Sequence, residues 1–205
     1  MHDFHLNYYN FLDFIVYLFL KILISYLYYF WMLTIIISDD LSGAAGMASL
    51  LGAHIPVIPY NRVHEAAKLD SEIVSIDLET RNLEDPRPRL DRVKHTFPDA
   101  RILARIDSLF RGSTLDFIAF IKGYGNIIMT DTIPEYGRYT LNGYSIDKNG
   151  SINITGILPG GLKPYVEIAD SRSYGDIINL AKRCVNENYL PVDPGVLIKY
   201  YLGIM

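Results

Sequence analysis

Residues 33–44, LTIIISDDLSGA, decide the expected fold. The run Leu33–Ile37 is short, apolar and rich in β-branched residues, which is typical of a buried strand in a parallel sheet. It passes without a linker into Ser38-Asp39-Asp40, and residues 41–52 then carry apolar side chains near helical spacing. A buried strand, a polar turn and a helix in direct succession indicate the start of a βαβ unit.

The rest of the chain repeats this alternation. Strands are expected over 55–59, 72–80, 101–107, 126–134 and 165–170, with one more short strand in the last 16 residues, and helices over 86–97, 113–123 and 173–189. A hairpin with its turn at 147–150 is expected near 139–155. The predicted fold is therefore α/β, a three-layer, Rossmann-like sandwich around a mostly parallel sheet with a small hairpin excursion.

Residues 1–31 differ in composition from the rest of the chain. They contain 12 of its 26 aromatic residues, and the stretch 11–37 is almost continuously apolar and long enough to span a bilayer. Lys21 lies in the middle of that stretch, where a charge costs about 3 kcal/mol, and residues 33–37 cannot serve both a membrane helix and a soluble sheet. We expect translation to begin at Met32, residues 1–31 to be an upstream artefact or a dispensable extension, and a chain starting at Met32 to fold and stay soluble. A membrane anchor and an amphipathic partner-binding helix are the alternatives.

Charge and cysteine content exclude several classes for this chain, whose expected domain is residues 32–205. The net charge of −4 argues against a broadly basic nucleic-acid binder. The single Cys184 excludes an internal disulfide framework and favours a reduced, cytoplasmic location. His54, His64 and His95 show no metal-ligand spacing with one another, and His2 and His5 lie in the leader, so no metal site is expected from the histidines.

Polar side chains follow four of the expected strands, where ligands bind in open parallel sheets. Carboxylates there accept hydrogen bonds from sugar hydroxyls, and arginines offer forked donors to a carboxylate or phosphate. The chemistry indicated is binding of a small polyhydroxylated anion. The candidate binding residues are Ser42, Gly43, Arg81, Asp107, Ser108, Arg111, Gly112, Gly137 and Arg138, and the candidate catalytic residues are Asp39 and Asp40.

Five segments at these positions resemble motifs of the four-carbon acid sugar kinases, in the same order along the chain. Residues 39–44, DDLSGA, resemble the family's D-D-L-T-G-A, and residues 104–113, ARIDSLFRGS, resemble K-K-I-D-S-T-L-R-G-N. Thr80-Arg81 is similar to an S-R pair after a strand, residues 134–143 to P-x-x-G-R-T-x-x-x-G, and residues 170–177 to D-A-x-x-x-x-D-L. The resemblance covers residues 33 to about 200.

This resemblance implies ATP-dependent phosphorylation of an erythronate, threonate or 3-oxo-tetronate. It places the sugar acid in an N-terminal domain like this one, with Asp39 or Asp40 orienting or deprotonating the acceptor hydroxyl. Arg81, Arg111 and Arg138 would then hold the carboxylate and steady the transferring phosphoryl group. ATP and Mg²⁺ would be bound mainly by a C-terminal nucleotide domain, which the sequence lacks, as it lacks a glycine-rich phosphate loop. The expected partners are the sugar acid, a separate nucleotide-binding subunit and, as an open alternative, further copies of this chain.

A second hypothesis from another class stays open. The chain would be a non-catalytic module that binds a small acid, or a truncated kinase remnant, in either case with membrane attachment through residues 1–31 as an option. An adjacent reading frame encoding a nucleotide domain would favour the kinase, and the absence of one would favour the binding module.

Overall fold

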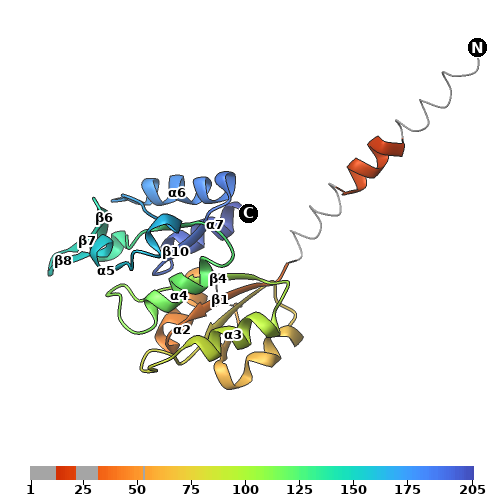
Figure 1. Cartoon of the computed structure of the whole chain (residues 1–205), viewed down its shortest axis with the longest axis horizontal. Coiled ribbons are helices and arrows are strands. Elements are labelled where there is room, and N and C mark those ends of the chain that lie inside the picture. The colour runs from red at the N-terminus through yellow and green to blue at the C-terminus, as the bar shows by residue number, and fades with distance from the viewer. Residues whose placement is uncertain (1–12, 22–31, 53) are drawn as a thin grey trace, which may run out of the picture.

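A computed structural model (Figure 1) describes residues 13–21, 32–52 and 54–205. Residues 13–21 are helical, and their apolar side chains are exposed. The rest of the predicted leader 1–31 lies outside the described residues. Within the described ranges no helix is both long enough and apolar enough to cross a membrane.

Seven parallel strands form the main sheet. Their order is β2-β3-β1-β4-β10-β5-β9, and every pairing is parallel. The strands are β1 (Thr34–Ser38), β2 (Val57–Pro59), β3 (Ile73–Asp77), β4 (Arg101–Arg105), β5 (Ile127–Met129), β9 (Val166–Ile168) and β10 (Leu190–Asp193). The predicted strand β1 lies between β3 and β4, with Ile36 opposite Ser75 on one side and Leu103 on the other. Proline-flanked β2 is an edge strand, as its composition indicates.

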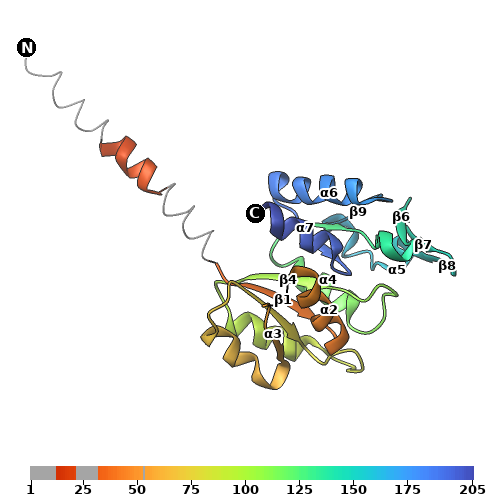
Figure 2. The ribbon, with the colours of Figure 1, turned by 180° about the vertical axis from the view of Figure 1, so that it is seen from behind.

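Helices cover both faces of this sheet, which confirms the three-layer α/β architecture. One face carries η1 (Tyr60–Lys68), α3 (Arg87–Thr96), α4 (Thr114–Ile121) and α5 (Ile154–Ile157), and the other carries α2 (Leu41–Leu51), α6 (Tyr174–Glu187) and α7 (Val196–Ile204). Successive strand residues point to opposite faces, so Ile35 and Ile37 join the first apolar core and Ile36 joins the second. The second group of helices comes forward when the molecule is turned around (Figure 2).

The predicted hairpin excursion is a three-stranded antiparallel sheet at one end of the molecule (Figure 1). It consists of β6 (Tyr139–Leu141), β7 (Tyr144–Asp147) and β8 (Gly150–Asn153), and Asp147 pairs with Gly150 across the turn. Buried hydroxyl groups join it to the main sheet, because Thr140 of β6 bonds to Thr130 at 3.0 Å and Thr130 to Ser171 at 2.9 Å. The excursion is therefore fixed against the carboxyl end of β5.

The structure contains helices that the sequence pattern did not predict, and α7 and η1 are the longest of them. The C-terminal segment, expected to hold one strand, continues after β10 into α7, and the Asp193 carboxylate accepts the backbone N–H groups of Leu197 and Ile198. Helix α7 buries Val196, Leu197, Ile198 and Tyr201, so it lacks a clear apolar-polar alternation. The 3₁₀ helix η1 buries only Val63 and Ala66, three residues apart. The predicted capping box of α6 is present at Ser173 and Asp176.

Candidate functional site

Three neighbouring strands bring the predicted acidic residues together at the carboxyl edge of the main sheet. Asp39 and Asp40 follow β1, Arg81 lies four residues beyond β3, and Asp107 lies two residues beyond β4. The backbone N–H groups of Thr80 and Arg81 donate to the Asp39 carbonyl oxygen at 2.9 and 3.0 Å, so the turn after β3 is fixed to the turn after β1.

Arg81 is the centre of this cluster. Its Nε and Nη2 donate to the two carboxylate oxygens of Asp39 at 2.9 and 3.1 Å, and its Nη1 lies 2.6 Å from Oδ2 of Asp40. Nη2 also reaches Oδ1 of Asp107 at 3.1 Å. All three guanidinium nitrogens thus face carboxylates of the chain itself, and the hydrogen bond with Asp39 raises the pKa of Arg81. The predicted forked donor is already occupied by three internal acceptors.

The two adjacent aspartates differ in accessibility. The side chain of Asp39 is 2% exposed, whereas that of Asp40 is 23% exposed. Asp40 is also the N-cap of α2, since its Oδ1 accepts the Gly43 N–H at 2.7 Å. Ser42 lies exposed in the first turn of the same helix. Asp40 is therefore the carboxylate of this pair that a ligand can reach.

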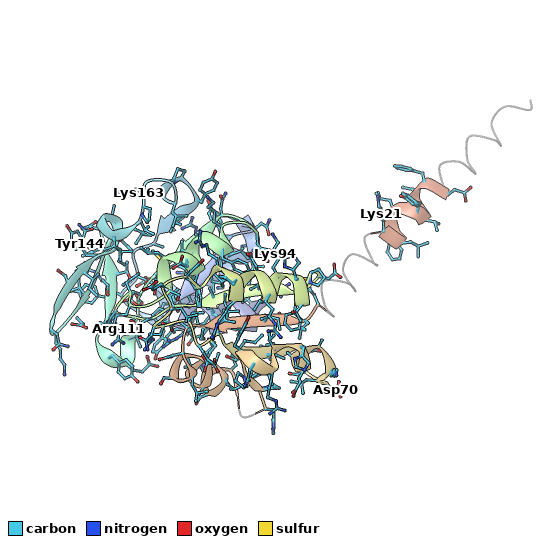
Figure 3. All side chains as sticks on the ribbon, turned by 60° about the horizontal axis from the view of Figure 1, so that its bottom comes forward. Lys21, Asp70, Lys94, Arg111, Tyr144 and Lys163 are labelled. Carbon is cyan, nitrogen blue, oxygen red and sulfur yellow. The ribbon has the colours of Figure 1, made fainter. Side chains whose placement is uncertain are left out.

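Asp107 and Arg111 form a second ion pair beside Arg81. Arg111 donates from Nε and Nη2 to the two oxygens of Asp107 at 2.9 and 2.8 Å, and its own backbone N–H and that of Leu109 donate to Oδ2. Burial raises the pKa of Asp107, but these donors outweigh it and hold the pKa at about 2. Arg111 is 58% exposed and lies at the same end of the molecule as Tyr144 of β7 (Figure 3), so its guanidinium is accessible to an anion.

Gly112 allows the loop after β4 to pass close to this cluster. Its φ is +60°, and a Cβ at this position would lie 2.8 Å from Oδ2 of Asp39 and 3.1 Å from the Arg81 Cα. A side chain there would displace the Asp39 carboxylate or the Arg81 backbone. The glycine of the predicted motif is thus required by both backbone conformation and space.

Arg138 directly precedes β6 and connects the three-stranded sheet to the loop after β4. Its Nη1 donates to the Ser108 carbonyl oxygen and its Nη2 to Oδ2 of Asp147, both at 2.6 Å. Gly137, with φ of +65°, ends the 3₁₀ turn η2 (Pro134–Tyr136) and directs the chain into β6. These groups border an open cleft of about 390 Å³ lined by Ser108, Glu135, Tyr136, Arg138, Asp147, Lys148 and Asn149.

Asp131 is a site residue that the sequence reasoning missed. It is fully buried just after β5, accepts a hydrogen bond from Ser145 Oγ at 2.5 Å, and lies 3.6 Å from Nη1 of Arg138. Its Oδ1 has no partner among the described residues. Burial raises its pKa to about 8, against the opposing effects of Ser145 and Arg138. The sequence signal for Asp131 is its position as an acidic residue within the mainly apolar run 126–134.

The predicted site residues therefore fall into two adjoining groups. One surrounds Arg81, and the other borders the cleft at Arg138. The members of the first are Asp39, Asp40, Ser42, Gly43, Arg81, Asp107, Arg111 and Gly112, and those of the second are Ser108, Gly137 and Arg138. Residues 107 and 108 join the two groups, since Asp107 contacts Arg81 and Ser108 contacts Arg138.

Comparisons with known proteins identify the family of this arrangement. The family model described as a sugar-binding N-terminal domain matches residues 34–156. A Bordetella bronchiseptica protein with a domain of unknown function (DUF1537), solved with bound citrate as a domain-swapped dimer, is 16% identical, with TM-scores of 0.66 and 0.67 in two crystal forms. A Haemophilus influenzae protein of the same DUF1537 family is 14% identical with a TM-score of 0.62.

These alignments cover 82% or 83% of this chain but only 55% or 56% of the solved chains, so the chain spans little more than half of their length. A search of curated proteins gave no match. The family match includes β1, the Arg81 cluster and the cleft at Arg138. The chain belongs to the family of sugar-binding N-terminal domains.

Proposed function

We propose that this chain is the substrate-binding half of an ATP-dependent kinase that phosphorylates four-carbon sugar acids such as erythronate, threonate or 3-oxo-tetronate. The observation that carries the proposal is the accessible Asp40 carboxylate, held by Arg81 beside the exposed Arg111. A carboxylate can accept the proton of a sugar hydroxyl, and a nearby guanidinium can bind an acid group. The citrate in the Bordetella structure supports a carboxylate ligand for this fold.

The two aspartates are proposed to have different roles. Asp40 orients the acceptor hydroxyl and accepts its proton, because its side chain is the more exposed of the two. Asp39 keeps both oxygens on Arg81 and acts as a positioning residue. Arg81 is likewise a positioning residue, since its three nitrogens hold Asp39, Asp40 and Asp107 in one arrangement.

Binding of the acid is assigned to the exposed side of the site. Arg111 directs one edge of its guanidinium to Asp107, and its large exposed fraction supports a second contact with a ligand anion. Arg138 and Ser108 border the adjoining cleft, in which the sugar acid would also lie. The cleft has the volume of a typical small-molecule site, roughly 300–1,000 Å³.

ATP and Mg²⁺ are proposed to be held by a separate nucleotide-binding domain. The described residues contain no group of three or more His, Cys, Asp or Glu side chains that could hold a metal ion. Asp39, Asp40 and Asp107 surround a guanidinium instead. These residues do not fit a resident metal, so we derive no step through one. The length of the solved relatives leaves room for a further domain.

A non-catalytic acid-binding module is the second candidate, because the chain spans only little more than half of those relatives. Isothermal titration of the full chain with threonate and erythronate, with and without Mg-ATP, tests both. Binding of the acid without ATP turnover supports a substrate-binding half. Binding of the acid without ATP turnover even after a nucleotide-binding domain has been added favours the module. Absence of binding by the folded chain would overturn both.

An arginine variant tests the site assignment. Arg111→Ala should lose threonate binding while the far-ultraviolet circular dichroism spectrum is unchanged. Arg183→Ala is the matched control, because Arg183 also pairs with carboxylates, Glu167 and Glu187, but lies on α6 outside the site. Equal affinity of Arg111→Ala and the wild type would exclude Arg111 from the binding site.

A further inference from the structure

The turn between β7 and β8 forms one wall of the cleft at Arg138. Asp147 and Gly150 pair across this turn, so Lys148 and Asn149 are its two loop residues. Oδ1 of Asp147 accepts the Asn149 N–H at 2.7 Å, and Oδ2 accepts Nη2 of Arg138 at 2.6 Å. Since Arg138 is held in turn by the Ser108 carbonyl oxygen, the backbone of Lys148 is fixed at the rim of the cleft.

The other charged groups lining this cleft already have partners. Arg138 and Asp147 neutralise each other. A hydrogen bond from Tyr174 of α6 lowers the pKa of Glu135, so this carboxylate is directed to a phenol. Among the residues that the structure describes, Lys148 has no hydrogen bond or ion pair. Of the two cations that line the cleft, Lys148 is therefore the one without a described carboxylate partner.

Arg81 and Arg111, the arginines beside Asp40, are less available than Lys148 to bind a ligand anion. All three nitrogens of Arg81 face Asp39, Asp40 and Asp107, and Arg111 already uses two nitrogens for Asp107. An entering carboxylate at Arg111 would share that guanidinium with Asp107. A carboxylate at Lys148 would compete with no described carboxylate, which favours Lys148 as an additional contact for the acid.

We propose that Lys148 is a specificity-determining residue that binds the anionic group of the substrate within the cleft and so selects acids over neutral polyols. The inference rests on the proposed function, because it adds a second contact for the acid, besides Arg111, at this same site. The ammonium provides three rotatable donors on a flexible side chain. It can therefore follow acids of slightly different shape while the turn that carries it stays fixed.

The test compares an acid with its neutral counterpart on four forms of the full chain. Threonate and threitol are titrated calorimetrically into the wild type, Lys148→Gln, Lys148→Arg and Lys94→Gln. Lys94 is the control because it lies in the last turn of α3, which leads to the start of β4 and hence to the opposite edge of the sheet (Figure 3). Lys148→Gln should weaken threonate binding about tenfold and leave any weak threitol binding unchanged, while Lys148→Arg and Lys94→Gln should stay near the wild type.

Salt supplies a second readout. Raising the ionic strength from about 0.01 to 0.15 M shortens the Debye length from about 30 to 8 Å, so threonate affinity should fall more in the wild type than in Lys148→Gln. Equal threonate affinity of Lys148→Gln and the wild type would overturn the inference and leave the proposed function standing. Absence of threonate binding by the wild type itself would overturn the proposed function, and the role of Lys148 with it.

Discussion

Replacement of the buried Asp131 by asparagine should change how the stability of the domain depends on pH. Burial raises the pKa of Asp131 to about 8, whereas an unfolded chain has an aspartate pKa of about 4. Between these values the folded protein keeps a proton that the unfolded chain releases. The free energy of unfolding therefore falls as pH rises through this window, by about 1.4 kcal/mol per pH unit.

The magnitude follows from the distance between the two pKa values. At pH 7 the wild type has lost about 4 kcal/mol relative to a chain with a neutral group at this position. An asparagine side chain is neutral at every pH and has nearly the same shape, and its oxygen can still accept the hydrogen bond that Ser145 now donates to Asp131. Asp131→Asn should thus match the wild type near pH 4, be the more stable protein by about 1.4 kcal/mol at pH 5, and be the more stable by several kcal/mol at pH 8.

Urea unfolding followed by circular dichroism at pH 5, 6, 7 and 8 measures this difference. The slope of the unfolding free energy against urea should be the same for both proteins, so that midpoints compare directly. Asp70→Asn is the control, since Asp70 is an exposed carboxylate (Figure 3). Parallel pH profiles for Asp131→Asn and the wild type would refute the reasoning, because Asp131 would then be ionised in the folded protein and paired with Arg138.

Three further predictions concern the Arg81 cluster. Gly112→Ala should destabilise the domain by about 1–2 kcal/mol through its positive φ alone and abolish threonate binding by displacing Asp39 or Arg81, as urea unfolding and calorimetry would measure. Asp40→Asn should keep threonate affinity within a few-fold but slow phosphoryl transfer, assayed with an added nucleotide domain, by about 10²- to 10⁴-fold; an unaffected rate would remove Asp40 from the mechanism. Asp107 has its folded pKa held at about 2, so its contribution of about 2 kcal/mol is present above pH 4 and lost as pH falls towards 2. Acid unfolding of Asp107→Asn should lack this loss, and an unchanged acid transition would contradict it.

The centre of the main sheet could be predicted from the sequence because strands such as β1 are buried on both faces. The run 33–37 is β-branched and uninterrupted, so its burial pattern needs no knowledge of its neighbours. Helix α7 could not be predicted in this way. It follows Pro194-Gly195, and its first N–H groups are bound by Asp193, which is the last residue of β10.

It could be predicted from the sequence that the candidate residues lie close together, but not how they pair. The position of Asp39, Arg81 and Asp107 after three strands indicates a shared edge of the sheet. The Arg81 guanidinium contacts both Asp39 and Asp107 because the strands lie in the order β3-β1-β4. No local sequence pattern encodes this order. Asp131 was missed for a related reason, since its partner Ser145 lies in a different sheet.

The small sheet is attached to the main sheet by hydrogen bonds between hydroxyl groups and not by apolar packing. All residues of β6, β7 and β8 are described, and none belongs to either apolar core. The small sheet is attached instead through directed hydrogen bonds of Thr130, Thr140 and Ser171. The turn that carries Lys148 can therefore change in sequence without repacking either apolar core.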